Sequence, residues 1–233
     1  MIIAILDDFL DEFVATMLTS TGIIMCEQAK INTLSSAQPG IREGVAVVMV
    51  GSFAPVHKGH FDAVHAASTA LAGQGNLVES VVLTPNSAEY VERKLPEDHG
   101  EWTYERRIHE ILGRSPHPHI PTYVDDVSGR LARHEQINGY VPVTMRRYLG
   151  FTACQTYLVV GSDQLLSMES HLENERNRAV CVLRPGSLDY ARDRLDLPWI
   201  AAAVEEGRFV ITERENMKTD ISSTAVRRSL VAG

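Results

Sequence analysis

Residues 51–60, which read GSFAPVHKGH, combine the groups with which proteins hold phosphate. The segment follows an apolar run typical of a buried strand and opens a pattern typical of a helix. Gly51 permits a sharp turn at the strand end, and Gly59 permits close approach of a ligand, because glycine has no side chain. His57 and His60 share one face of the predicted helix, at the end whose unpaired N–H groups attract anions. The segment therefore predicts a site where both imidazoles donate to one phosphate chain.

A second segment, DISSTAVRR at residues 220–228, offers similar chemistry. Ser222 or Ser223 is a good N-cap for the helix that follows, and Arg227 would then lie in its first or second turn. Hydroxyl groups, free N–H groups and a guanidinium gathered at a helix start make another anion site.

Both motifs have plainer alternatives. A histidine taken alone is more often a polar surface or capping residue, and the second segment taken alone is more often an ordinary capped helix with a solvated arginine. Metal ligation by His57 and His60 is less favoured, because no third ligand lies close in the sequence. The strand–glycine–loop–helix context of the first motif, together with the second motif, favours two anion sites and no resident metal.

Strands and helices alternate along the rest of the chain. Such alternation favours parallel pairing through right-handed crossovers, and hence a doubly wound, Rossmann-like α/β sheet. Ligands of such sheets lie beyond the carboxyl ends of the strands, near the point where the strand order reverses, so both motifs are expected at that edge. The predicted strands are residues 44–51, 77–85, 120–126, 156–163, 179–186 and 208–213, with helices over 57–73 and after residue 220.

Residues 1–44 differ in pattern from the rest. Apolar residues recur at helical spacing over residues 2–17, with four acidic residues between them, which predicts an acidic amphipathic helix. Residues 32–44 are rich in Ser, Gln, Gly and Pro, a composition typical of a linker. We therefore expect an N-terminal helical extension and linker over residues 1–44 and one main domain over residues 45–233.

The composition narrows the classes of protein. Of the 233 residues, 44% are hydrophobic and 22% are charged, which is normal for a globular chain, and the net charge of -8 argues against a protein that coats nucleic acid. No run of about 18 apolar residues occurs, so no membrane span is expected. The acidic start lacks the basic region of a signal peptide, and the three cysteines are far apart, so we expect a cytoplasmic protein with reduced thiols. Assembly into a homo-oligomer is left open.

The pair of motifs, G-S-F-x-P-x-H-x-G-H and I-S-S-T-x-x-R, resembles that of the nucleotidylyltransferase superfamily. Within it, the chain is most similar to the nicotinamide or nicotinate mononucleotide adenylyltransferases. Weaker matches follow in the same order and cover roughly residues 45–233: residues 84–94, RRIH at 106–109, VGSD at 160–163 and RPG at 184–186.

The resemblance implies attack by the phosphate of a small mononucleotide acceptor on the α-phosphorus of ATP, with release of pyrophosphate and no covalent enzyme intermediate. His57 and His60 would hold the ATP phosphates and stabilise the pentavalent centre. Arg227, Ser222 and Ser223 would hold the β- and γ-phosphates. Mg²⁺ is expected to bind mainly through the ATP phosphates, because no carboxylates cluster in the sequence.

Further site residues are implied in the same way. Asp163 would bind the ribose of ATP, with a helix N-cap as its plainer role. Arg107 is a candidate for the acceptor phosphate, with a surface salt bridge as the alternative. Trp102 is the candidate to replace the ring-stacking aromatic residue that residues 124–128 lack. The other expected ATP contacts are Gly51, Ser52, Phe53, Lys58, Gly59, Gly161 and Thr224.

Three rival functions remain at this point. One is another transferase of the superfamily, such as a phosphopantetheine adenylyltransferase or a cytidylyltransferase. The second is an ATP-binding regulatory module without turnover. The third is a class I aminoacyl-tRNA synthetase core, which the short acidic chain disfavours.

Overall fold

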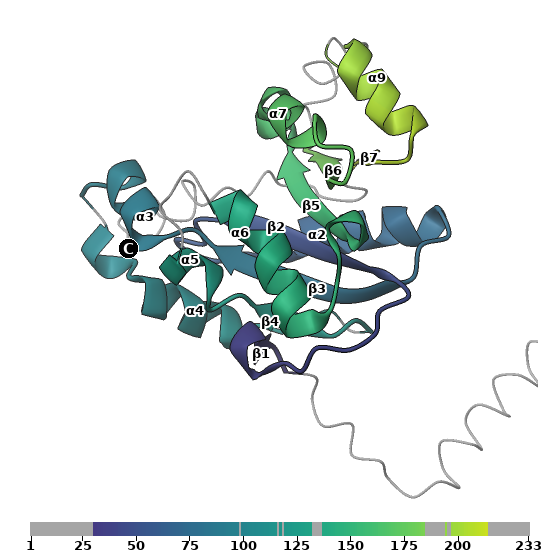
Figure 1. Ribbon diagram of the computed structural model, residues 1–233. Coiled ribbons are helices and arrows are strands. Elements are labelled where there is room, and N and C mark those ends of the chain that lie inside the picture. The colour runs from purple at the N-terminus through teal and green to yellow at the C-terminus, as the bar shows by residue number, and fades with distance from the viewer. Residues whose placement is uncertain are drawn as a thin grey trace, which may run out of the picture.

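The computed structural model describes residues 30–97, 99–115, 117, 119–131, 137–184, 194 and 197–213. Across these ranges the chain forms a seven-stranded sheet in the order β1-β4-β3-β2-β5-β6-β7, and each neighbouring pair is parallel (Figure 1). The predicted α/β class and parallel sheet are confirmed. The strands are β1 (Asn32–Thr33), β2 (Val45–Gly51), β3 (Val78–Pro85), β4 (Thr122–Val124), β5 (Thr156–Gly161), β6 (Arg178–Leu183) and β7 (Phe209–Glu213).

Helices cover both faces of this sheet, with α2 on one side and α6 on the other (Figure 1). The α-helices are α2 (Lys58–Gly73), α3 (Ala88–Lys94), α4 (Tyr104–Leu112), α5 (Ser128–Leu131), α6 (Ile137–Thr144), α7 (Glu169–Leu172) and α9 (Pro198–Glu205). Shorter turns are η1 (Leu34–Ser36), η2 (His99–Glu101), η4 (Met145–Leu149), η5 (Ala153–Gln155) and η6 (Ser162–Met168). No helix in the described ranges has both the length and the apolar character needed to cross a bilayer.

The strand order reverses between β2 and β5. Chain order runs outward from β2 through β3 to β4 on one side, and through β5 and β6 to β7 on the other. This is the doubly wound arrangement, in which the crevice at the reversal point binds ligands. Gly51 pairs with Pro85, and Met49 pairs with Val159, so the carboxyl ends of β2, β3 and β5 lie side by side.

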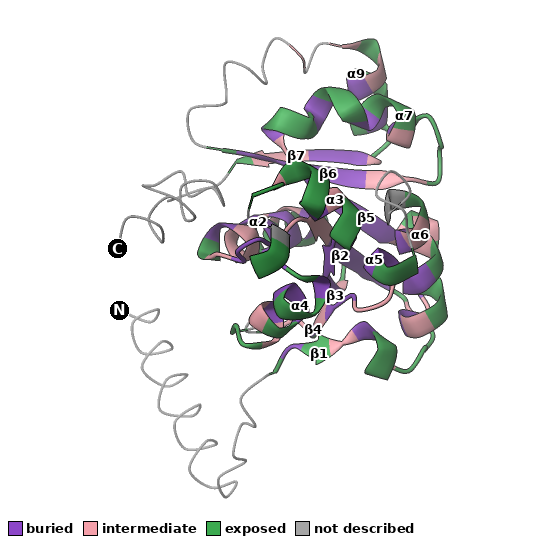
Figure 2. Cartoon of the chain, turned by 90° about the vertical axis from the view of Figure 1, so that its left-hand side faces the viewer, coloured by how far each residue is buried: buried purple, intermediate pink, exposed green. Residues whose placement is uncertain are grey.

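Side chains alternate between the two faces of the sheet, as the period of a strand requires. On one face, a single apolar cluster joins Val47 and Val159 of the sheet to residues of α2 and α4, such as Leu71 and Ile111. The other face carries two clusters. One packs the β2–β3 half of the sheet against α6 and η4, and the second packs the β5–β7 half against η6, α7 and α9. Buried residues accordingly concentrate on the strands and on the inward faces of the helices (Figure 2).

The segment expected to be a linker, residues 32–44, packs against the sheet instead. Its first two residues form β1, in which Thr33 pairs with Val124 of β4. Leu34 is completely buried beside α6 and η4. Farther along, Arg42 donates from Nε to the carbonyl of Leu149 at 2.7 Å. Polar composition concealed this role, because one buried leucine and backbone pairing are enough to anchor the segment. The predicted helix over residues 2–17 lies outside the described residues.

Removal of the Leu34 side chain tests whether this segment belongs to the core. Leu34→Ala should lower the free energy of unfolding by about 2–5 kcal/mol, the usual range for a fully buried leucine. Ile41→Ala is the matched control, because Ile41 is 98% exposed in the same segment. Urea unfolding followed by circular dichroism measures both. Equal midpoints for the two variants would show that the segment does not contribute to the core.

Candidate functional site

The loop between β2 and α2 is held by buried side chains. Phe53 is completely buried and has a φ of +47°, a conformation uncommon for a residue with a side chain. Its ring lies against Gly51, where an added Cβ would come within 3.2 Å of the Phe53 Cζ atom. Residues 54–56 are buried too, and the Ala54–Pro55 peptide bond is cis. A side chain at the strand end would therefore crowd the phenylalanine ring, which would have to shift by a few tenths of an ångström.

The structure brings His57 and His60 together at the start of α2. His57 is the N-cap residue, and its backbone N–H donates to Nδ1 of His60 at 3.1 Å. The two imidazole rings stack with centroids 3.8 Å apart, and the Phe53 ring meets His60 edge-on at 4.8 Å. Because Nδ1 of His60 accepts a hydrogen bond, the proton of the neutral ring is on Nε2. His60 is thereby fixed as a donor at a helix start, where anions are favoured.

Two lysines near this loop have different surroundings. Lys94, at the end of α3, donates from Nζ to the Ser52 hydroxyl at 3.4 Å. Lys58 instead forms an exposed ion pair with Asp62, one turn along α2, at 2.8 Å. Lys94 therefore adds positive charge to the loop itself, whereas the charge of Lys58 is paired with the Asp62 carboxylate on the helix.

Arg107 is neither exposed nor in a surface salt bridge. The residue is completely buried under the loop, where Nη1 donates to the carbonyls of Ser52 (2.9 Å) and Asn86 (2.8 Å). Its Nε donates to the carbonyl of Trp102 at 3.1 Å. Burial lowers the pKa of Arg107 to about 10, so the guanidinium remains a cation at neutral pH. Among the described residues, the surface salt bridge considered as the alternative is not formed, and the side chain supports the loop from below. A contact of Arg107 with the acceptor phosphate stays a prediction.

Trp102 also belongs to the scaffold. The residue is only 4% exposed and packs in a small cluster with Ala54 and Val91. The Arg106 guanidinium covers its ring at 4.6 Å from the centroid. Its ring therefore offers little surface on which an acceptor ring could stack, and the contact of Trp102 with the acceptor stays a prediction.

Beside the loop, the end of β5 supplies Gly161 and Asp163. Asp163 is exposed in the first turn of η6, with Oδ1 3.7 Å from Nη2 of Arg184. An added Cβ on Gly161 would lie 2.6 Å from Oδ1 of Asp163, so a larger residue there would require the exposed Asp163 side chain to move. Because β5 is the neighbour of β2, this carboxylate lies at the same edge of the sheet as the histidine pair.

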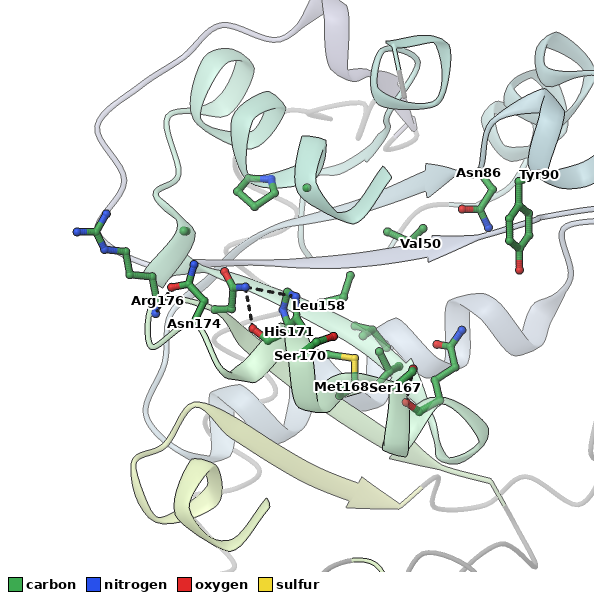
Figure 3. Close-up of a pocket in the computed structure, with 17 residues that line it drawn as sticks. Val50, Asn86, Tyr90, Leu158, Ser167, Met168, Ser170, His171, Asn174 and Arg176 are labelled. Atoms are coloured by element: carbon green, nitrogen blue, oxygen red, sulfur yellow. Dashed lines mark hydrogen bonds between the residues drawn. The ribbon is translucent and has the colours of Figure 1, made fainter. Parts of the chain in front are cut away.

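A groove of about 700 Å³ runs along the α6 face of the sheet from this edge (Figure 3). Val50, Leu158 and Val160 line its floor, between α6 on one side and η6 with α7 on the other. Figure 3 shows Asn86 and Tyr90 at one end and Asn174 and Arg176 at the other. None of the described residues that line it is Asp or Glu. The groove thus suits a polar or anionic ligand.

The far end of the groove is organised by hydrogen bonds between side chains and backbone. Nδ2 of Asn177 donates to the carbonyl of His171 at 2.8 Å and lies 3.4 Å from its Nδ1 (Figure 3). Burial lowers the pKa of His171, which keeps this imidazole neutral at pH 7. Sequence reasoning missed these residues, because residues 164–177 show no spacing that marks a site.

Outside the groove, His65 and His117 form a separate pair. Nδ1 of His65 lies 2.9 Å from Nε2 of His117, and His117 accepts from the His119 backbone N–H. Burial, followed by the neighbouring His65 and His119, lowers the pKa of His117. In the described part of the chain, no three His, Cys, Asp or Glu side chains are arranged to hold a metal ion.

The second sequence motif lies in a part of the chain that the structure does not describe. Ser222, Ser223, Thr224 and Arg227 lie outside the described residues, as do Pro185 and Gly186. The meeting of Arg227 with His60 therefore stays a prediction.

Comparison with known proteins agrees with this geometry. A family model described as cytidylyltransferase-like matches residues 48–229, a span that includes both motifs. No curated protein matches the chain. The model covers well over half of the sequence, and its match begins in β2, the strand that leads into the histidine loop. By this match, the chain belongs to the cytidylyltransferase-like family of the nucleotidylyltransferase superfamily.

Proposed function

We propose that the protein transfers AMP from ATP to the phosphate of nicotinamide or nicotinate mononucleotide and releases pyrophosphate. The observation that carries the proposal is the stacked pair of His57 and His60 at the start of α2, beside the point where the strand order reverses. Family membership supports nucleotidyl transfer in general. The choice of ATP and of a pyridine acceptor rests on the similarity of the sequence motifs.

The reaction that fits this site is a single displacement. An oxygen of the acceptor phosphate attacks the α-phosphorus of ATP, the bond to the β-phosphate oxygen breaks, and pyrophosphate leaves with the electron pair. Negative charge grows on the equatorial oxygens in the transition state. His60 presents Nε2–H toward such charge without reorganisation, because the His57 backbone already holds its Nδ1. Mg²⁺, carried by the triphosphate, would neutralise the leaving group.

The acceptor would be held by two parts of the site. Ser52 and Lys94 supply a hydroxyl and an ammonium group for its phosphate, next to the histidine loop. The remainder would enter the groove on the α6 face, whose polar lining side chains are mostly amides and hydroxyls. Tyr90 is the aromatic residue among the described groove residues, at the end nearest the loop. It is the candidate for contact with a pyridine ring, in place of Trp102.

The nucleotide would lie across the ends of β2 and β5. The Asp163 carboxylate suits the paired hydroxyls of a ribose. We further propose that Ser222, Ser223, Thr224 and Arg227 complete the site around the β- and γ-phosphates, as the second sequence motif predicts.

Pyrophosphate release from native protein tests the proposal. ATP and CTP, each with Mg²⁺, are combined with nicotinamide mononucleotide, nicotinate mononucleotide and phosphopantetheine. We expect release only with ATP and a pyridine mononucleotide, together with formation of the dinucleotide. Release with CTP or with phosphopantetheine would assign a different transferase of the same superfamily. ATP binding without release in any combination would identify a regulatory module.

His60→Ala tests the role of the histidine pair. Loss of one preorganised donor to transition-state charge costs on the order of 10²–10³ in kcat, and we expect a loss of that size with the fold intact. His65→Ala is the matched control, because His65 lies on the same helix but pairs with His117 away from the loop. Steady-state pyrophosphate release compares the two variants. Near-native turnover in His60→Ala would show that the pair is structural.

Ser167→Tyr tests whether the acceptor occupies the groove. Ser167 lies in η6 and lines the groove, so a tyrosine there would fill part of it. We expect the acceptor KM to rise about tenfold or more, equivalent to about 1.4 kcal/mol of binding, with the ATP KM unchanged. Thr69→Tyr, at an exposed position of α2, controls for a new surface tyrosine. An unchanged acceptor KM would place the acceptor elsewhere.

A further inference from the structure

Arg107 joins three separate segments of the chain at one buried point. Its guanidinium donates to the carbonyl of Ser52 in the histidine loop, to that of Asn86 after β3, and to that of Trp102 before α4. The first two segments are also tied by their backbones, because the N–H of Asn86 donates to the carbonyl of Gly51 at 2.8 Å. The loop that carries the histidines and the loop that leads to Lys94 are thus fastened to the same side chain.

Burial of this guanidinium has an unfavourable desolvation free energy, which is hard to explain if Arg107 only stabilises the fold. Arg107 is completely buried, no ion pair to a carboxylate is recorded for it within the described residues, and its Nη2 is buried without a hydrogen-bond partner there. Three carbonyls and the Tyr104 ring, whose centroid is 5.4 Å from the guanidinium carbon, compensate the charge in part. Burial of a charge is still expensive, and a well-packed apolar residue would often stabilise the fold more. The cost becomes understandable if a rigid spacing between the two loops is what the protein requires.

We propose that Arg107 is a positioning residue for nucleotidyl transfer. It fixes the distance between the histidine pair, which faces the α-phosphate, and the Ser52–Lys94 pair, which faces the acceptor phosphate. This inference rests on the proposed function of the site. It differs from that function in assigning Arg107 no contact with either substrate.

Only a guanidinium has the geometry for this task. Its planar fork reaches several carbonyls at fixed angles, whereas a lysine ammonium is a compact point charge on a flexible stem. Arg107→Lys therefore keeps the positive charge beneath the loop and removes the three-way connection. Displacement of reacting groups by about 1 Å can cost 10²-fold in rate, so we expect a fall of about that size in kcat. Affinity for ATP should stay close to native, because the proposed ATP contacts do not include this side chain.

The test compares Arg107→Lys with Arg106→Lys in the full chain. Arg106 is the neighbour on α4, is about half exposed and covers Trp102. Amide hydrogen exchange without ligand is the first readout, and it does not depend on any activity. We expect faster exchange confined to residues 51–57 and 86–90 in Arg107→Lys, with native exchange throughout Arg106→Lys. Kinetics with ATP then separate kcat from nucleotide affinity.

Each outcome decides the inference. Local loss of protection with a lower kcat and native ATP affinity supports it. Native exchange in both loops overturns it, even if the native protein proves inactive with all acceptors tested. Arg107→Gln, which retains two amide donors, is the second variant. Loss of amide protection throughout the fold in both Arg107→Lys and Arg107→Gln also overturns the inference, because Arg107 would then stabilise the whole fold. Equal loss of kcat in Arg106→Lys would remove the specific role of Arg107.

Discussion

The parallel pairing of β2 with β3 on one side and β5 on the other is the constraint on which the structure depends. Parallel neighbouring strands need crossover connections, and the helices of these connections cover both faces of the sheet. Because the strand order reverses between β2 and β5, the helical layer is interrupted there. On the α6 face the gap separates two apolar clusters, and Val50 packs against both. The groove opens there, and Val50, the residue before Gly51 in β2, belongs to its lining. The reversal of strand order thus determines both the arrangement of the helices and the position of the groove.

Rigidity at this edge comes from buried groups rather than from the polar residues that would do chemistry. Phe53 holds the loop from inside, Gly51 makes room for its ring, and Arg107 fastens the loop to the segment after β3. The hydrogen bond from the His57 backbone to His60 Nδ1 and the stacking of the two rings then align the pair. A preorganised donor avoids reorganisation during the reaction, which is how the proposed site would stabilise the transition state of nucleotidyl transfer.

Sequence patterns predicted the parts of this molecule that depend on local periodicity. Strands β2 to β7 and α2 follow from short apolar runs and helical spacing, whereas β1 lies in the segment expected to be a linker. The proximity of His57 and His60 follows from their three-residue separation. Patterns could not reveal Arg107, because its partners are carbonyls that lie far from it in the chain. Nor could they reveal the contribution of Leu34, a single buried residue in a polar segment, or the groove, whose lining comes from several elements.

The hydrogen bond between the His57 backbone and Nδ1 of His60 is the most direct point at which to test the account. Nitrogen NMR of the imidazole rings, with His60 identified through His60→Gln, reports the tautomer of that ring and its response to Mg-ATP. The account predicts a neutral ring with the proton on Nε2 in the free protein. It also predicts that Mg-ATP shifts the Nε2 resonance while Nδ1 remains an acceptor. A proton on Nδ1 in the free protein, or an Nε2 resonance that does not shift at saturating Mg-ATP, would contradict the account.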